Sequence, residues 1–270
     1  MIDLHLHSGW TDFFHEEQEK RSPEEIRARI ETFLAKYEEK GIVLSRDAGG
    51  FEGTDRHIIR CAGMVIQNNY QDREFLKKVF SDTGEWVKIM ATGGMGAPPE
   101  NVTDPMIPER EFKYLVEQFH LHGKKVMVHC WGGKSLYWSI EAKADTIEHG
   151  VYLTKEQADK MAEHGIPLIP TTAIYRLLAE EPGLFHIPQI LQERAKRACE
   201  GHSHAIRYAL SSGVLIGHGT DFYADPDLAE YAGYEWKMLQ DYGLTKEQAT
   251  AAGTTVAEHI LGKKVHSGTV

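Results

Sequence analysis

Eight short apolar segments recur along the chain, and most of them are followed by a stretch with the polar and apolar spacing of an amphipathic helix. Such alternation is typical of a parallel (β/α)8 barrel and, less often, of a doubly wound open sheet. We therefore expect an α/β protein with the architecture of a (β/α)8 TIM barrel. The expected strands are Ile2–His7, Ile42–Asp47, Ile58–Ile66, Trp86–Met90, Lys125–His129, Thr146–His149, Pro167–Thr171 and Val214–His218. The clearest helical stretches are Ser22–Lys40, Pro108–His122, Thr154–His164 and Pro188–Ser212.

Capping residues mark where two of these helices begin. Ser22 precedes one helical stretch, and Thr154 is followed three residues later by Gln157, which is the spacing of a capping box. Gln67–Thr83 and Gly94–Pro108 show no clear pattern, so the third and fourth units of the barrel are the least defined.

Length and composition limit the classes of protein to consider. The 270 residues suit one barrel of about 250 residues, and no linker or repeat divides them, so we expect a single domain over residues 1–270. The net charge of −10 argues against nucleic-acid binding, and no apolar run has the roughly 20 residues of a membrane helix. Cys61, Cys130 and Cys199 indicate no disulfide framework, which fits the cytoplasm.

Histidines lie at positions where a barrel would gather them. His5 and His7 are two residues apart, so they share one face of their strand, whereas Leu4 and Leu6 face the covering helices. Two imidazoles with this spacing can hold one metal ion. A His-x-His pair alone is equally typical of an ordinary surface strand.

Lys88 lies within an apolar strand, where a charged amine is costly to bury. It is either paired with an acid, placed at the barrel mouth, or carboxylated by carbon dioxide. The carboxylated form is an anionic carbamate whose two oxygens can bridge two metal ions.

Three more polar residues follow strands at their carboxyl ends, where barrel enzymes place their catalytic groups. His129 and His149 end successive strands, and Asp221 follows the last one. Each has an ordinary alternative, a satisfied core histidine or a helix-capping aspartate. Their joint placement favours metal ligands, with Asp221 also taking a proton from the attacking water.

The order of these residues resembles the amidohydrolase superfamily: Asp-x-His-x-His on the first strand, Lys on the fourth, His on the fifth and sixth, and Asp after the eighth. The phrases at residues 45–50, 87–94, 145–150 and 219–221 resemble a narrower branch. That branch contains imidazolonepropionase-like proteins and prolidase-related metal-dependent dipeptidases. The resemblance runs from Asp3 to about Gly262.

The resemblance implies a centre of two divalent metal ions. The first ion would be held by His5, His7 and Asp221, the second by His129 and His149, and carboxylated Lys88 would bridge them. Nitrogen and oxygen ligands of this kind suit zinc, with manganese, iron or cobalt as alternatives. Glu148 is expected to face away from this centre, because it alternates with His149 on the strand.

The sequence departs from this branch in two respects. Its members usually carry a small β-sandwich at both ends, but only four residues precede His5 and eight follow Gly262. We expect the sandwich to be absent, and the bare barrel ends make a homo-oligomer plausible. His218 stands where a small residue is usual, as either a substrate contact or a packing variant.

The expected reaction is hydrolysis of an amide bond in a small molecule such as a dipeptide, an N-acyl amino acid or a cyclic amide. A metal-bridging hydroxide would attack the carbonyl, and Asp221 would pass the proton of the hydroxide to the leaving group. Trp10, Trp131, Tyr175 and Arg176 lie in loops where substrate contacts are expected. Arg176 would pair with a substrate carboxylate, unless it is an ordinary surface arginine.

Other functions fit parts of the same pattern. A lactonase, an esterase or a phosphotriesterase-like enzyme would use the same centre, and a barrel that binds metal without turnover is a further alternative. The complete ligand set argues against the last. A mononuclear deaminase would need a glutamate near the histidine of the fifth strand, and none lies within ten residues of His129.

Overall fold

The computed structural model describes residues 1–96 and 102–265, whose strands form two parallel sheets. One has the order β3-β2-β1-β9, and the other has the order β4-β5-β6-β7-β8. The strands are β1 (Ile2–His7), β2 (Leu44–Asp47), β3 (Ile58–Ile59), β4 (Cys61–Val65), β5 (Trp86–Met90), β6 (Lys125–Cys130), β7 (Thr146–His149), β8 (Leu168–Ile169) and β9 (Phe222–Tyr223).

The two sheets are connected at both sides, which gives the expected (β/α)8 barrel arrangement. Only Arg60 separates β3, which pairs with β2, from β4, which pairs with β5, so one bent strand belongs to both sheets. On the other side, the amide of Leu168 donates to Leu215 at 2.9 Å, and the amide of Leu4 donates to His218 at 2.8 Å. Residues 215–218 therefore lie between β8 and β1.

The prediction of a regular eighth strand over Val214–His218 is wrong. This segment makes one isolated bridge, between Ile216 and Leu168, and β1 pairs instead with β9. Gly217 explains the short pairing, because it contributes no side chain and sits close to Ile169 and Leu4.

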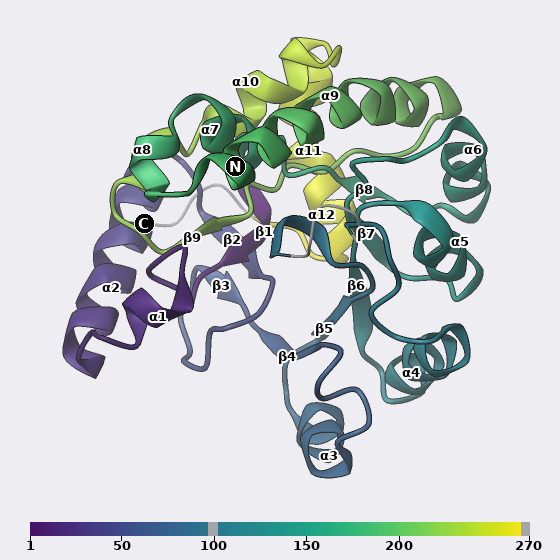
Figure 1. Ribbon diagram of the computed structural model, residues 1–270, viewed down its shortest axis with the longest axis horizontal. Coiled ribbons are helices and arrows are strands. Elements are labelled where there is room, and N and C mark those ends of the chain that lie inside the picture. The colour runs from purple at the N-terminus through teal and green to yellow at the C-terminus, as the bar shows by residue number, and fades with distance from the viewer. Residues whose placement is uncertain (97–101, 266–270) are drawn as a thin grey trace.

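Helices surround the strands, with α2 to α6 on the outside of the ring in Figure 1. The predicted capping box of Thr154 and Gln157 is present, and the predicted capping residue Ser22 also forms a capping box, with Glu25. The helices are α1 (His15–Gln18), α2 (Pro23–Glu39), α3 (Arg73–Ser81), α4 (Glu109–Leu121), α5 (Gly133–Glu141), α6 (Lys155–His164), α7 (Thr172–Glu180), α8 (Pro182–Phe185), α9 (Gln189–Ser212), α10 (Tyr234–Asp241), α11 (Lys246–Ala252) and α12 (Thr255–Leu261), with 3-10 helices η1 (Gly94–Gly96) and η3 (Leu228–Tyr231).

The two stretches in which the sequence showed no clear pattern have different structures. Gln67–Thr83 contains α3, whereas Gly94–Pro108 contains η1 and falls partly outside the described residues. Within the described ranges, the helices are too short or too polar to cross a membrane.

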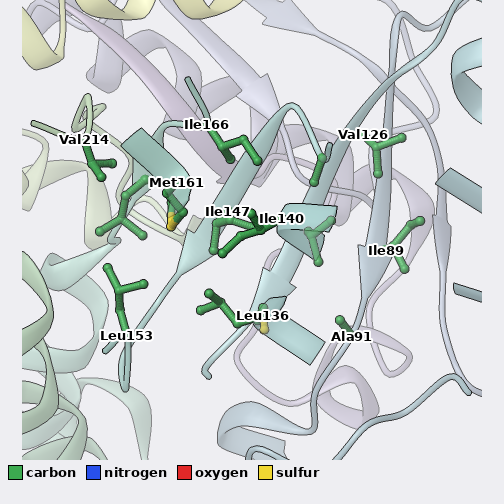
Figure 2. Packing of buried hydrophobic residues seen from close by; sticks show 14 of the residues in the cluster. Ile89, Ala91, Val126, Leu136, Ile140, Ile147, Leu153, Met161, Ile166 and Val214 are labelled. Carbon is green, nitrogen blue, oxygen red and sulfur yellow. The ribbon is translucent and has the colours of Figure 1, made fainter. Parts of the chain in front are cut away.

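The outward faces of the strands pack against the helices. Figure 2 shows Ile89 of β5 and Ile147 of β7 in the same buried cluster as Ile140 of α5 and Met161 of α6. Because side chains alternate along a strand, burial of Ile89 outside places Lys88 on the inner face. Packing of the apolar residues thus fixes the direction of the polar ones.

Candidate metal centre

His5, His7 and Asp221 come together at the carboxyl end of β1. Asp221 Oδ1 lies 3.2 Å from Nε2 of His5 and 3.3 Å from Nε2 of His7. Asp221 reaches them because its φ is +58° and its amide donates to the carbonyl of His5 at 2.7 Å. The ligand atoms of the three residues lie within 4.8 Å of one another, which is close enough for one metal ion.

Lys88 of β5, His129 of β6 and His149 of β7 lie beside these three residues. Lys88 Nζ lies 3.1 Å from His5 Nε2, and the ring of His149 lies 5.0 Å from that of His5 and 4.4 Å from that of His129. Within the described part of the chain, Nε2 of His129 and Nε2 of His149 are buried without a hydrogen-bond partner. Buried polar atoms without partners are costly, so these nitrogens fit a role as metal ligands.

Three of the histidines have their Nδ1 engaged by the protein. Nδ1 of His5 contacts Glu148, Nδ1 of His7 lies 3.0 Å from the carbonyl oxygen of Gly49, and Nδ1 of His149 lies 2.8 Å from the hydroxyl of Thr171. Metal-binding histidines commonly have the second ring nitrogen held in this way, which leaves Nε2 for the metal.

The electrostatics keep the candidate ligands in the states that bind metals. Burial lowers the pKa of His129 and His149 well below the usual value, so both imidazoles are neutral. Burial would raise the pKa of Asp221, but the adjacent His5 and His7 outweigh it and hold that pKa well below its usual range. Burial also lowers the pKa of Lys88, which favours the neutral amine that reacts with carbon dioxide.

The expectation that Glu148 faces away from the centre is wrong. Glu148 Oε2 lies 2.5 Å from His5 Nδ1, and its two oxygens accept from Arg46 at 2.9 and 3.1 Å. Strand alternation fails here because His149 has a φ of +71°, so both residues face the interior. The sequence contained a signal for this position. Simple alternation would place either Glu148 or His149 on the helix-covered face, where a buried charge such as that of Glu148 is costly.

A second carboxylate, Asp47, supports His7 through Gly49 and was not predicted as part of the site. Asp47 accepts from the amide and hydroxyl of Ser8 at 3.1 and 2.8 Å, and from the amide of Gly49 at 3.0 Å. These bonds hold the turn after β2, whose Gly49 carbonyl contacts His7.

A cavity of about 860 Å3 opens over the centre. Of the predicted substrate contacts, the structure brings Trp10 and Tyr175 to its wall. Trp131 is fully buried behind the wall, where its Nε1 donates to the Tyr175 hydroxyl at 3.2 Å. Arg176 and His218 are not brought to the cavity.

Each of these two residues faces other partners. Arg176 lies one helical turn before Glu180 on α7, and their charged groups are 3.2 Å apart. His218 is fully buried, where Gly253 packs against both His218 and Met1. Conversely, Arg194 on α9 lines the cavity and was missed, because nothing in its helical context distinguishes it from a surface arginine.

Comparisons with known proteins identify the family and the fold of the chain. An ochratoxinase from Aspergillus niger is 25% identical over 135 residues, which are 50% of this chain and 28% of the ochratoxinase. The match therefore spans less than a third of that relative.

Solved structures share the fold over nearly the whole chain. A prolidase crystallised with N-methylphosphonate-L-proline superposes with a TM-score of 0.82 at 20% identity, covering 100% of this chain and 76% of the prolidase. A Xaa-Pro dipeptidase with methionine in its active site gives 0.81 at 19% identity, covering 97% and 75%. The family model described as "Amidohydrolase family" matches residues 1–270. The chain therefore belongs to the amidohydrolase family.

Proposed function

We propose that this protein is a metal-dependent hydrolase that cleaves an amide bond in a small molecule such as a dipeptide, an N-acyl amino acid or a cyclic amide. The observation that carries the proposal is the convergence of Asp221 and the inner-face histidines beside Lys88, at the floor of a cavity. Relatives named as a prolidase and a Xaa-Pro dipeptidase support cleavage of a carbon–nitrogen bond.

The donor set fits two divalent ions, with zinc the best match and manganese, iron or cobalt as alternatives. His5, His7 and Asp221 would hold one ion, His129 and His149 the other, and carboxylated Lys88 both. When bound, the ions supply Lewis-acid activation of the scissile carbonyl and of the attacking water.

The residues of the chain supply orientation and proton transfer. Glu148 fixes His5, and Gly49 fixes His7, so both imidazoles present Nε2 to the centre. Asp221 Oδ1 contacts both histidines, whereas Oδ2 lies 3.8 Å from Nδ1 of His149, beyond hydrogen-bond distance. Oδ2 is thus the atom that accepts the proton of the attacking water and returns it to the leaving nitrogen.

The test combines metal analysis with a hydrolysis screen. Protein loaded with zinc or manganese is analysed for metal and assayed on dipeptides, N-acyl amino acids, lactones and a phosphotriester. We expect two ions per chain and turnover of an amide. Asp221→Asn keeps the size of the side chain but loses the proton acceptor, and we expect kcat to fall by about 10²–10⁴-fold. Fewer than one ion per chain, or turnover of lactones or phosphotriesters without any amide, would overturn the proposal.

A further inference from the structure

The cavity has a wall rich in methionine on the β4 and β5 side. Met64, Met90 and Met106 line it, and Met95 lines the cavity where η1 meets α9, so half of the eight methionines in the chain line the cavity. The wall begins beside the metal centre, because Met64 packs against Gly49, whose carbonyl contacts His7. Thioether side chains adapt to irregular shapes and make favourable contacts with aromatic rings.

The facing wall is aromatic and aliphatic. Trp10 stacks on His7 with ring centroids 3.9 Å apart, and Phe13 and Phe14 follow it along the chain. Helix α7 adds Leu178, and α9 adds Ile190, which is 48% exposed. The aromatic wall thus also begins at the metal centre and continues toward the solvent.

The charged groups that line the cavity are engaged by the protein. Asp12 accepts two hydrogen bonds of 2.7 Å from Arg21, and Arg194 donates to the carbonyl of Met95. Lys88 and Asp221 belong to the metal centre. The remaining wall offers apolar surface, where a charged substrate group would lose its hydration.

The cavity is also large for a small amide. Its volume of about 860 Å3 lies toward the upper end of the roughly 300–1,000 Å3 found for pockets that hold drug-sized ligands. We propose that the substrate carries a bulky, uncharged apolar group, aromatic by preference, which lies between the methionine and aromatic walls while the scissile amide faces the metal centre. This inference rests on the proposed function and adds the substrate class.

A series of amides that differ in one group tests the inference. The metal-loaded protein is assayed on the acetyl, hexanoyl, succinyl and 2-naphthoyl derivatives of methylamine, a small leaving group that is the same throughout. We expect kcat/KM to increase at least about tenfold from acetyl to naphthoyl, and the negatively charged succinyl derivative to rank below hexanoyl. Equal values for acetyl and naphthoyl, or a preference for succinyl, would overturn the inference while the proposed function stands.

Two variants locate the effect in the cavity. Ile190→Glu places a charge on the apolar wall, and we expect it to reduce the naphthoyl-to-acetyl ratio of kcat/KM at least about fivefold. Leu121→Glu is the matched control, because Leu121 is 72% exposed and lies outside the cavity. An unchanged ratio in Ile190→Glu contradicts the inference.

A binding measurement separates this inference from the proposed function. Titration calorimetry with 2-acetonaphthone, a ketone without an amide bond, is carried out on metal-loaded wild type and Ile190→Glu. Binding that is weakened in the variant, together with no turnover of any amide, supports the inference and contradicts the proposed function. Absence of binding to the wild type contradicts the inference.

Discussion

Glu148 Oε2 lies 2.5 Å from Nδ1 of His5, and this contact joins a buried ion pair to the candidate metal centre. Both Arg46 and Glu148 are fully buried, and Arg46 holds the pKa of Glu148 at about 2 against the effect of burial, which alone would raise it. Glu148 is therefore an anion that accepts a hydrogen bond from the protonated Nδ1 of His5. The lone pair of Nε2 of His5 then faces Asp221 and Lys88.

We expect Glu148→Gln to weaken metal binding by about 10–100-fold, since partners behind a metal ligand typically contribute that much. The same change leaves Arg46 buried without its counter-charge, so the free energy of unfolding should fall by about 3–5 kcal/mol. Chelator competition measures the affinity, and urea denaturation measures the stability.

The double variant Arg46→Met, Glu148→Gln separates the two effects. Removing both charges should recover most of the stability but not the metal affinity, because His5 still lacks its anionic partner. Wild-type metal affinity in Glu148→Gln would show that Glu148 serves the fold alone.

A second prediction concerns carbon dioxide. Lys88 is 1% exposed and burial lowers its pKa, so its neutral amine can form a carbamate. We expect metal-free wild type to take up two zinc ions with bicarbonate present, and to take them up much more slowly in carbon-dioxide-free buffer. Lys88→Arg cannot form the carbamate and should bind one ion or fewer in either buffer.

Lys124→Arg is the matched control for this experiment. Lys124 is also a buried lysine, but it donates to the carbonyls of Asp82 and Gly84 and lies before β6 rather than at the centre. Metal uptake by this variant should depend on bicarbonate as in wild type. Equal uptake by wild type in both buffers would exclude a structural carbamate.

A third prediction concerns the close approach of Gly94 to His129. A Cβ on Gly94 would lie 2.5 Å from Nε2 of His129, and its φ is +58°. Gly94→Ala should therefore displace the His129 ring and lower kcat about 100-fold, as expected for a misplacement of about 1 Å. Gly123→Ala has a similar φ of +71° but no atom within 4 Å, so it introduces the strain without the contact.

Both glycine variants should lose a similar amount of stability, of about 1 kcal/mol. Thermal unfolding measures the loss of stability in each variant, and steady-state kinetics show whether kcat falls only in Gly94→Ala. Equal kcat in the two variants would contradict the placement of His129 against η1.

The sequence predicted best the strands whose two faces differ in polarity, although both of their faces are buried. The bounds of β1, β5 and β7 agree with the structure, because alternation of polar and apolar residues marks a strand whose two faces differ. Helix α7 gave no such pattern, since seven of its nine residues are buried and only Arg176 and Glu180 reach the solvent.

The part of the site that lies at the strand ends was also predictable from the sequence. Parallel strands end at one edge, so polar residues at their ends could be placed together from the sequence. Strand alternation alone misplaced Glu148, because the backbone at His149 leaves the extended conformation, and only the cost of a charge on the helix-covered face pointed to its inward position. The cavity walls could not be predicted, since α7 and α9 come together only in the tertiary structure.

The last prediction uses Glu235, a buried acid of α10 that contacts the first turn of α7. Glu235 Oε2 accepts from the hydroxyl of Thr172 at 2.8 Å and the amide of Ala173 at 2.6 Å, whereas Oε1 has no partner among the described residues. Burial raises the pKa of Glu235 to about 8 from the usual 4.5. Between these values the folded protein keeps a proton that the unfolded chain has released, so stability falls as pH rises.

Glu235→Gln removes this titration while it keeps the acceptor oxygen. We expect the variant to match wild type near pH 5 and to become progressively more stable than wild type up to about pH 8. The gain there should be on the order of a few kcal/mol, because one unit of pKa difference corresponds to about 1.4 kcal/mol. Urea midpoints at pH 5 to 9 measure it, with exposed Glu163→Gln as the control that should show no such trend. A constant difference across this range would mean that Glu235 is already ionised at pH 5 in the folded protein, and that its buried surroundings include a positive partner for Oε1.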